Sequence, residues 1–363
     1  SYSVTGVQTC ALPIWPELAA VQLEFASAET GEPELKASRV RKVVEGTRQR
    51  LELAWQESHG FAITAEIELR GEQPEAGLRV EVASNRTAGV KAPGLKSVTY
   101  PRLMGLGELS EGGAADRLLW PESTGLLFYN PTHLPALRDE GLWSIYPHGS
   151  AGASLQLFAY YAEGKGGFSV ATYDSQLTAK AFRFGPEHNT LGAQITHFMW
   201  DMRPGAGFKQ DYYTVIKPLA RGDWYEAADT YRQWAGHQPW CSKGTVKERS
   251  QKEGWQWLPE EVGAASFGLS SSRDESAWYE AYSKRAGTRM LHILGWDWSA
   301  TDWWSGKPGL EPWLPAEFNE ANLTAIKAAG DYWAPFMFDL FSSAPGATEH
   351  YVRPKEQIGR AHV

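Results

Sequence analysis

The sequence has little cysteine, no long apolar run and no cluster of positive charge. Only two cysteines occur in 363 residues, Cys10 and Cys241, which excludes a fold that depends on several disulfides. No stretch approaches the roughly 20 apolar residues that a membrane-spanning helix needs. The formal charge is −8, and no run of Lys or Arg is long enough to follow a phosphate backbone. We therefore expect neither a membrane nor a nucleic acid as a partner.

Metal-ligand and nucleotide-binding motifs are also missing. His148, His197 and His292 are scattered and lack the H-x-x-x-H or H-E-x-x-H spacing of metal sites, so we expect structural histidines. The segment Ser266–Arg273 contains no Gly-rich phosphate loop. Ser270–Ser272 lie outside any G-x-S-x-G motif, which favours a loop over a nucleophile. The sequence predicts no cofactor and no metal.

Both ends of the chain resemble translated DNA adapters. Ser3–Ile14 resembles an in-frame translation of a common sequencing adapter, and Ile358–Val363 resembles that of its reverse complement. We therefore expect residues 1–14 and 357–363 to be adapter-derived artefacts at the ends of a broken DNA fragment. On this interpretation Cys10 is artefactual and the true N-terminus is missing. Periplasmic, secreted and cytoplasmic locations then all stay open.

Tryptophan is unusually abundant. The chain contains 17 Trp, and aromatic residues make up 13% of it. Such a surplus indicates either a large layered core or flat platforms that stack on ligand rings. Sugars suit such platforms, because their C–H faces are apolar while their edges are polar.

The first two thirds of the sequence has the pattern of an all-β domain. From Val21 to about Arg203, short runs of alternating apolar residues are separated by Gly, Pro, Asn and Asp, which predicts an antiparallel β-sandwich. The clearest expected strands are Phe61–Leu69, Leu78–Ala83, Leu155–Tyr161, Gly167–Asp174, Ala179–Phe184, Ala193–Trp200 and Tyr212–Pro218. Apolar residues of Asp223–Ala235 then recur at helical spacing, with Asp223 as the cap. We assign residues 15–237 to the sandwich and this trailing helix.

A second domain of the α/β class is expected after a linker. The polar, basic segment His237–Gly254 favours a linker, assigned to residues 238–256. Expected strands and helices then alternate as Ala264–Leu269, Asp274–Ala286, Met290–Trp298, Pro315–Ala329 and Tyr332–Asp339. Alternation predicts parallel strands, which fit a barrel or a doubly wound sheet. The missing phosphate loop favours the barrel, so residues 257–356 are predicted to be the first three units of a (β/α)8 TIM barrel.

The ends of these strands carry the candidate sugar-binding residues. In TIM barrels the active site lies at the C-terminal ends of the strands. A carboxylate there can accept hydrogen bonds from sugar hydroxyls while an indole stacks beneath the ring. The candidates are Trp296, Asp297, Trp298, Asp302, Trp303, Trp304 and Asp339. Alternatively, the aspartates cap loops and the tryptophans seal a domain interface.

A catalytic role for the two strand-end aspartates is less favoured than a binding role. Asp297 and Asp339 follow adjacent expected strands, and could be separated by the roughly 5–9 Å of a glycosidase carboxylate pair. Many carbohydrate-active barrels nevertheless take both catalytic acids from later strands. The early strand ends then only bind hydroxyl groups.

Several short stretches carry a family resemblance. They are Tyr146-Pro147 with Ser154–Tyr161, the Gly166-Gly167 hairpin, Thr172-Tyr173-Asp174 with Lys180, the helix after Gly222, and Gly295-Trp296. Together they resemble a poorly characterised group of bacterial glycoside hydrolase-like proteins, distantly similar to α-galactosidases and endo-α-N-acetylgalactosaminidases. The resemblance implies a galactose-mutarotase-like sandwich followed by a barrel.

The resemblance also implies where the missing chemistry lies. In such barrels the nucleophile is expected on the fourth strand and the acid/base on the sixth, both beyond Gln357. The chain would then be an inactive fragment of a glycoside hydrolase acting on an oligosaccharide or glycan. A non-catalytic carbohydrate-binding protein is the alternative, and a sugar isomerase or lyase barrel is a weaker one.

Overall fold

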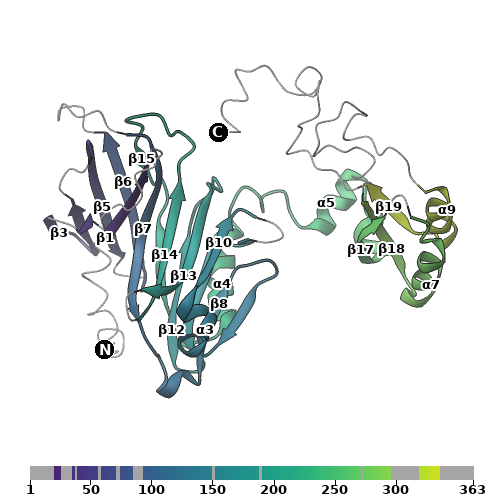
Figure 1. Cartoon of the computed structure of the whole chain (residues 1–363), viewed down its shortest axis with the longest axis horizontal. Coiled ribbons are helices and arrows are strands. Elements are labelled where there is room, and N and C mark those ends of the chain that lie inside the picture. The colour runs from purple at the N-terminus through teal and green to yellow at the C-terminus, as the bar shows by residue number, and fades with distance from the viewer. Residues whose placement is uncertain are drawn as a thin grey trace. The chain divides into compact units, whose positions relative to one another are not determined.

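The chain forms two compact units that divide at Ser242. The computed structural model describes residues 20–25, 35–36, 39–55, 59–70, 74–84, 93–148, 152–187, 190–270, 273–295 and 319–335. Figure 1 shows the first unit as mostly strands and the second as a small group of strands and helices. Each unit is a separate body and is described by itself.

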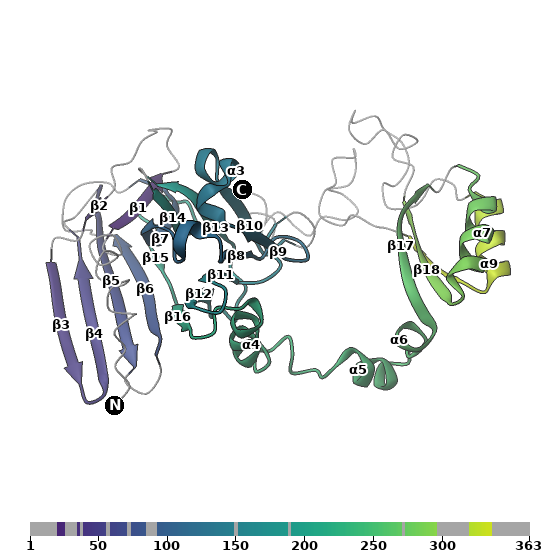
Figure 2. The ribbon, with the colours of Figure 1, turned by 90° about the horizontal axis from the view of Figure 1, so that it is seen from below.

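Two antiparallel sheets make up the first unit (Figures 1 and 2). The six-stranded sheet has the order β10-β13-β14-β7-β1-β2, with β1 (Ala20–Phe25), β2 (Leu35–Lys36), β7 (Leu95–Leu106), β10 (Leu142–Tyr146), β13 (Lys180–Glu187) and β14 (Thr190–Phe198). The larger sheet has the order β3-β4-β5-β6-β16-β12-β11-β8-β9, with β15 also paired to β6. Its strands are β3 (Arg39–Glu45), β4 (Arg48–Ala54), β5 (Phe61–Arg70), β6 (Ala76–Ser84), β8 (Asp116–Trp120), β9 (Leu126–Tyr129), β11 (Leu157–Ala162), β12 (Gly166–Thr172), β15 (Phe208–Lys209) and β16 (Thr214–Leu219).

A continuous apolar core fills the space between these sheets. Period-two alternation directs one face of each strand inward, as with Phe182 and Phe184 of β13, which are fully buried in the core. Trp120 is also fully buried, and its indole nitrogen donates to the Ser144 hydroxyl oxygen at 2.9 Å. That bond satisfies the polar end of the largest core side chain. The prediction of an antiparallel β-sandwich is confirmed.

Helix α4 (Trp224–Ala235) covers part of the outer face of the larger sheet. The Asp223 carboxylate caps it by accepting from the Glu226 amide at 2.6 Å, as the sequence predicts. Ala227 packs on Tyr161 in one apolar cluster. Tyr231 packs on Leu157 in another, and its hydroxyl oxygen accepts from the Gln156 amide at 3.4 Å. The short helix α3 (Pro135–Asp139) and the 3-10 turns η2 (Glu111–Gly113) and η3 (Pro131–His133) connect strands.

Gly222, just before α4, occupies a position that only glycine fits. Its φ is +62°, and a Cβ atom there would collide with the Ala162 carbonyl oxygen and lie 2.7 Å from the Gly166 amide nitrogen. We expect Gly222→Ala to lower the free energy of unfolding by about 2–3 kcal/mol. Gly112 is the matched control, since its φ is +59° but nothing lies within 4 Å of an added Cβ. Gly112→Ala should lower the free energy of unfolding by only about 1 kcal/mol. If urea unfolding gives the same loss for both variants, the Cβ collision at Gly222 is not the cause.

The second unit contains three parallel strands in sequential order, β17 (Val262–Ser270), β18 (Arg289–Gly295) and β19 (Tyr332–Pro335). Helices α7 (Ser276–Ala286) and α9 (Glu320–Ala329) lie on the same side of this sheet (Figure 2). They pack together through a cluster that includes Tyr279 and Ile326. The predicted alternation of strands and helices is present, but the described residues do not include a closed barrel.

Part of the segment expected to be a linker is helical. Helix α5 (Val246–Glu253) begins with a capping box, in which the Thr245 hydroxyl oxygen accepts from the Glu248 amide at 3.2 Å and the Glu248 carboxylate accepts from the Thr245 amide at 2.7 Å. Gly254 ends the helix in the left-handed conformation, at φ +80°. Helix α6 (Trp257–Glu261) then leads into β17. The local capping signals explain why this polar segment is helical.

The described residues contain neither a membrane-spanning helix nor a cluster of metal ligands. No helix in the described part of the chain is long and apolar enough to cross a membrane. Among the same residues, no group of three or more His, Cys, Asp or Glu side chains could hold a metal ion.

Candidate functional site

The three parallel strands of the second unit end at one edge of their sheet. Ser270, the last residue of β17, pairs with Gly295, the last residue of β18. Pro335, at the end of β19, pairs with Leu294. The chain therefore leaves all three strands within one short stretch of sheet edge, which is where α/β folds bind ligands.

The predicted sugar-binding residues follow these ends directly along the sequence. Asp297 is two residues past the end of β18, and Asp339 is four residues past the end of β19. All seven candidates lie outside the described residues: Trp296, Asp297, Trp298, Asp302, Trp303, Trp304 and Asp339. The structure fixes where the strands that carry them end, and their ligand-binding role stays a prediction.

A buried polar cluster is held near the start of β19. His292 is fully buried, and its Nε2 lies 3.0 Å from the Asp331 carboxylate, which also accepts from the Met290 amide at 3.0 Å. The Tyr279 ring packs edge-on against His292, with the ring centroids 4.9 Å apart. Asp331 directly precedes β19, so this cluster joins a helix–strand loop to β18 rather than facing the strand ends. The cluster therefore stabilises the fold of the second unit.

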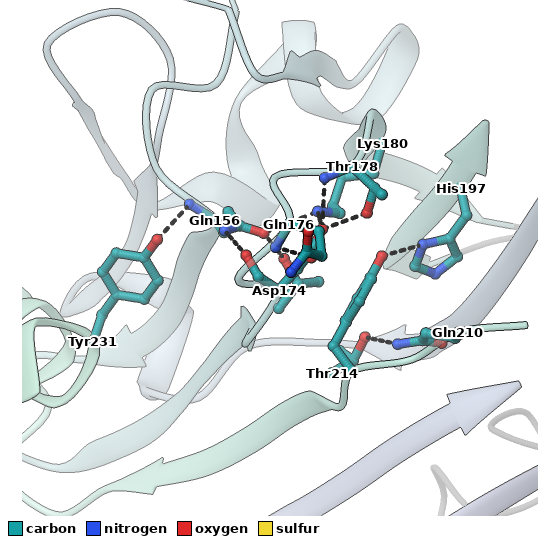
Figure 3. A network of polar contacts seen from close by, with 11 residues as sticks. Gln156, Asp174, Gln176, Thr178, Lys180, His197, Gln210, Thr214 and Tyr231 are labelled. Carbon is teal, nitrogen blue, oxygen red and sulfur yellow. Dashed lines mark hydrogen bonds and ion pairs between the residues drawn. The ribbon is translucent and has the colours of Figure 1, made fainter. Parts of the chain in front are cut away.

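A second buried polar network closes one end of the sandwich core (Figure 3). Lys180, at the start of β13, donates from Nζ to the Asp174 carboxylate at 2.7 Å and to the Gln156 side-chain oxygen at 2.9 Å. Its ammonium group also lies 5.0 Å from the ring centroid of Tyr146 and 4.9 Å from that of Tyr212. Carboxylate, amide and two aromatic rings thus surround a cation that has no exposed surface.

The charges of this pair follow from its surroundings. Burial lowers the pKa of Lys180 to about 8, although hydrogen bonding to Asp174 opposes the shift. For Asp174, burial raises the pKa, but hydrogen bonds from Lys180 and Thr178 outweigh it and the net shift is downward. The Gln176 amide adds a further bond to the same carboxylate at 2.8 Å. Both groups are therefore charged at neutral pH, and both side chains are almost fully enclosed.

His197 on β14 extends the network and has a defined tautomer. Its Nε2 lies 2.8 Å from the Tyr100 carbonyl oxygen, which can only accept, so Nε2 carries the proton. Its Nδ1 then accepts from the Tyr212 hydroxyl at 2.8 Å. Burial lowers the pKa of His197 to about 4, so the ring is neutral at physiological pH.

A cavity of about 340 Å³ lies beside this network. It is lined by Tyr173, Tyr213 and the Asp174–Thr178 turn, among others. A neighbouring cavity of about 300 Å³ shares Lys209 with it and is lined mainly by paired charges such as Arg79 and Glu66, whose nearest side-chain N and O atoms are 3.1 Å apart. Each of these two cavities has room for a small molecule.

The fold is shared with solved glycoside hydrolases. The alpha-N-acetylgalactosaminidase NagBb from Bifidobacterium bifidum, in its Gal-NHAc-DNJ complex, is 14% identical and superimposes with a TM-score of 0.56, covering 87% of this chain and 52% of that one. Its GalNAc complex gives a TM-score of 0.55, with 87% and 53% covered. The GH36 alpha-galactosidase AgaB from Geobacillus stearothermophilus, at 11% identity and a TM-score of 0.38, is too dissimilar to support a conclusion.

These matches include both units of the chain. The first unit ends at Ser242 of 363 residues, so an alignment over 87% of the chain extends into the second unit. The chain spans about half the length of the NagBb structures. No protein-family model and no curated protein matches the sequence. The resemblance to glycoside hydrolases expected from the sequence is thus confirmed at the level of the fold.

Proposed function

We propose that this chain is part of a glycoside hydrolase that acts on an oligosaccharide or glycan. It carries the sandwich and the first strands of a (β/α)8 barrel, and the catalytic acids lie on barrel strands beyond it. The observation that supports this most is the order of the two units. A two-sheet antiparallel sandwich precedes three parallel strands in sequential order, and the superposition on NagBb covers 87% of the chain.

The absence of a Gly-rich phosphate loop from Ser266–Arg273 favours a barrel over a doubly wound sheet, while the arrangement of the second unit fits both. In a doubly wound sheet the strand order reverses and helices cover both faces. Here β17, β18 and β19 are neighbours in sequential order, and α7 and α9 pack against one another on one side (Figure 2). Three sequential parallel strands with two helices on one side occur in a TIM barrel and also in one half of a doubly wound sheet.

The residues following the strand ends would form part of the sugar-binding mouth. Asp297 and Asp339 follow neighbouring strands, and the tryptophans of the intervening loop supply indole surfaces. We propose that the aspartates accept hydrogen bonds from sugar hydroxyls and that the indoles stack on the ring. Since NagBb is named an alpha-N-acetylgalactosaminidase, N-acetylgalactosamine is the first sugar to test.

The test separates binding from turnover. We expect no hydrolysis of a chromogenic α-N-acetylgalactosaminide by this chain, together with N-acetylgalactosamine binding that Asp297→Ala weakens about tenfold, the equivalent of one lost charge-assisted hydrogen bond. Asp274→Ala is the control, because this exposed carboxylate only bonds Ser276 at the start of α7. Hydrolysis that Asp297→Ala abolishes would contradict the absence of catalytic acids from this chain. If Asp297→Ala leaves the affinity for N-acetylgalactosamine unchanged, Asp297 does not form part of a sugar-binding mouth.

A longer form of the protein distinguishes the enzyme from a non-catalytic binder. If the protein is a glycosidase, the chain that includes the later strands should hydrolyse the same substrate. It should lose that activity when an acidic residue at the end of the fourth or sixth strand is replaced. Binding without hydrolysis by the longer chain would identify a carbohydrate-binding protein instead.

A further inference from the structure

The cavity of about 340 Å³ in the sandwich has no role in the proposed function. Its walls come from four parts of the first unit: Glu75 and Gly77 at β6, residues between Tyr173 and Thr178, β15 (Phe208–Lys209), and residues between Asp211 and Val215. The volume is at the lower end of the roughly 300–1,000 Å³ found for small-molecule sites. That size suits one six-membered ring with its substituents.

Two tyrosines form aromatic walls, and both are held in place. Tyr173 stacks on Trp234 of α4 with the ring centroids 4.8 Å apart and the planes only 6° from parallel, so α4 supports it from one side. Tyr213 packs tightly over Gly77, where a Cβ atom would lie 2.9 Å from its Cδ1. Its hydroxyl donates to the Glu66 carboxylate at 2.9 Å. A ring that is fixed before binding loses little conformational entropy when a ligand stacks on it.

Gly77 leaves the space that the Tyr213 ring occupies. Any side chain at Gly77 would displace the tyrosine ring, because the contact would be closer than real Cβ atoms make. The Arg79 guanidinium, two residues further along β6, lies 5.0 Å from the centroid of the same ring. The tyrosine is therefore held by Gly77, by Arg79 and by its hydrogen bond to Glu66.

The polar groups around the cavity match a neutral polyhydroxylated ligand. Ser175 and Gln176 supply a hydroxyl and an amide group from a single turn, which the buried Asp174 carboxylate orders by accepting from the Gln176 and Thr178 amides at 2.8 and 2.7 Å and from the Thr178 hydroxyl. Asp174 itself is neutralised by Lys180, 2.7 Å away.

The remaining charges disfavour an anion. Glu75, Lys209 and Asp211 line the cavity and form no ion pair among the described residues, which leaves a net charge of about −1. A phosphate or a uronic acid would be repelled. Carboxylates beside aromatic walls instead favour a sugar. Its hydroxyl groups donate hydrogen bonds to the carboxylates, and its C–H faces pack on the aromatic rings.

We propose that this cavity binds one neutral sugar residue of a glycan, at a site separate from the barrel mouth. The sugar ring packs against Tyr173 and Tyr213, and its hydroxyls bond to the Ser175–Thr178 turn and to Asp211. Every residue used lies in the sandwich, so the site does not depend on the proposed barrel. Such a site would hold a glycan on the protein independently of the catalytic strands.

Isothermal titration of the full chain with methyl glycosides of galactose and N-acetylgalactosamine tests the site. The titration is made in the Asp297→Ala background, in which binding at the mouth is expected to be about tenfold weaker. We expect saturable binding of at least one sugar that Tyr173→Ala or Tyr213→Ala weakens about tenfold. Tyr213→Phe, which keeps the ring, should retain binding within about twofold. Trp200→Ala is the control, since this residue is 68% exposed and does not line the cavity.

Ser175→Trp keeps the test decisive if the tyrosine variants fail to fold. Ser175 is exposed, and a tryptophan there would fill the cavity without removing either wall. Loss of sugar binding in the folded Ser175→Trp chain supports the site. Three results overturn it: no sugar binding in the Asp297→Ala background, unchanged binding in folded Ser175→Trp, or tighter binding of adenosine than of either sugar. None of them bears on the barrel mouth, whose test is the Asp297→Ala comparison itself.

Discussion

Replacing Lys180 with methionine is expected to lower the free energy of unfolding of the sandwich by about 3–5 kcal/mol. The ammonium and the Asp174 carboxylate are both enclosed, with side-chain exposures of 0% and 1%, and they are 2.7 Å apart. Methionine fills nearly the same volume but leaves the carboxylate buried without its cation. It also leaves the Gln156 side-chain oxygen with one donor fewer. Urea unfolding followed by far-UV circular dichroism measures the loss.

Two further variants test whether the lost stability comes from leaving the Asp174 charge buried without a partner. Adding Asp174→Asn to Lys180→Met should recover part of the stability, because the uncompensated negative charge is then gone. Arg232→Ala removes an ion pair to Asp229 in which the arginine is 78% exposed, and should leave the unfolding midpoint near that of the wild type. Similar losses for Lys180→Met and Arg232→Ala would show that enclosure of the pair is not what stabilises it.

Acidification from pH 7 to pH 5 is expected to destabilise the sandwich by about 2 kcal/mol through His197 alone. Burial lowers the pKa of this ring to about 4 in the folded protein, from its ordinary 6.5. The unfolded chain therefore binds a proton below pH 6.5 that the folded chain accepts only near pH 4. The stabilisation is complete above pH 6.5 and is lost progressively as the pH falls through that window.

The slope of stability against pH identifies the residue responsible. His197→Gln should be less stable than the wild type at pH 7, since it disturbs the bonds to Tyr100 and Tyr212, but should lose less on acidification. His133→Gln is the matched control, because His133 is half exposed and contacts Glu108 at the surface. It should retain the wild-type slope. An unchanged slope in His197→Gln would assign the acid sensitivity to other groups.

The sandwich strands were predictable because their local pattern and their packing agree. Phe61–Leu69 and Ala179–Phe184 alternate apolar and polar residues, and the structure places strands at Phe61–Arg70 and Lys180–Glu187. The cap at Asp223 was also predictable, because the capping residue directly precedes the helix in the sequence. Strand order was not predictable, since β7 lies between β14 and β1, which are far apart in the sequence. Such pairings depend on tertiary packing that no short window records.

The buried network was missed, although the sequence holds one signal for it. Lys180 has the same parity in its strand as Phe182 and Phe184, so a charged residue is directed into the core. An inward lysine requires a buried partner. Asp174 was part of the family resemblance, but its pairing with Lys180 depends on the turn between β12 and β13. Gln156 was expected within the strand Leu155–Tyr161, but it precedes β11, and its contact with Lys180 had no signal in the sequence.

For the candidate sugar-binding residues, the described structure includes the strands that precede them but not their side chains. The positions of the strand ends that precede them followed from alternating strands and helices, and the structure has β18 ending at Gly295 and β19 at Pro335. Their side chains lie outside the described residues, so the binding roles of Asp297 and Asp339 stay predictions. The cavity between Tyr173 and Tyr213 could not be predicted, because it depends on contacts of Gly77 and α4 that are distant in sequence.

Helix α4 also determines where the sandwich can be cut out for separate study. Ala227 and Tyr231 cover apolar residues on the outer face of β11, and Trp234 supports Tyr173. A recombinant domain that stopped at the end of β16 would expose these surfaces to water and to other copies of itself. The smallest autonomous module therefore includes α4 and the residues up to Ser242, among them Trp240, whose ring contacts Trp234, and a protease that cleaves after Ser242 should release it intact.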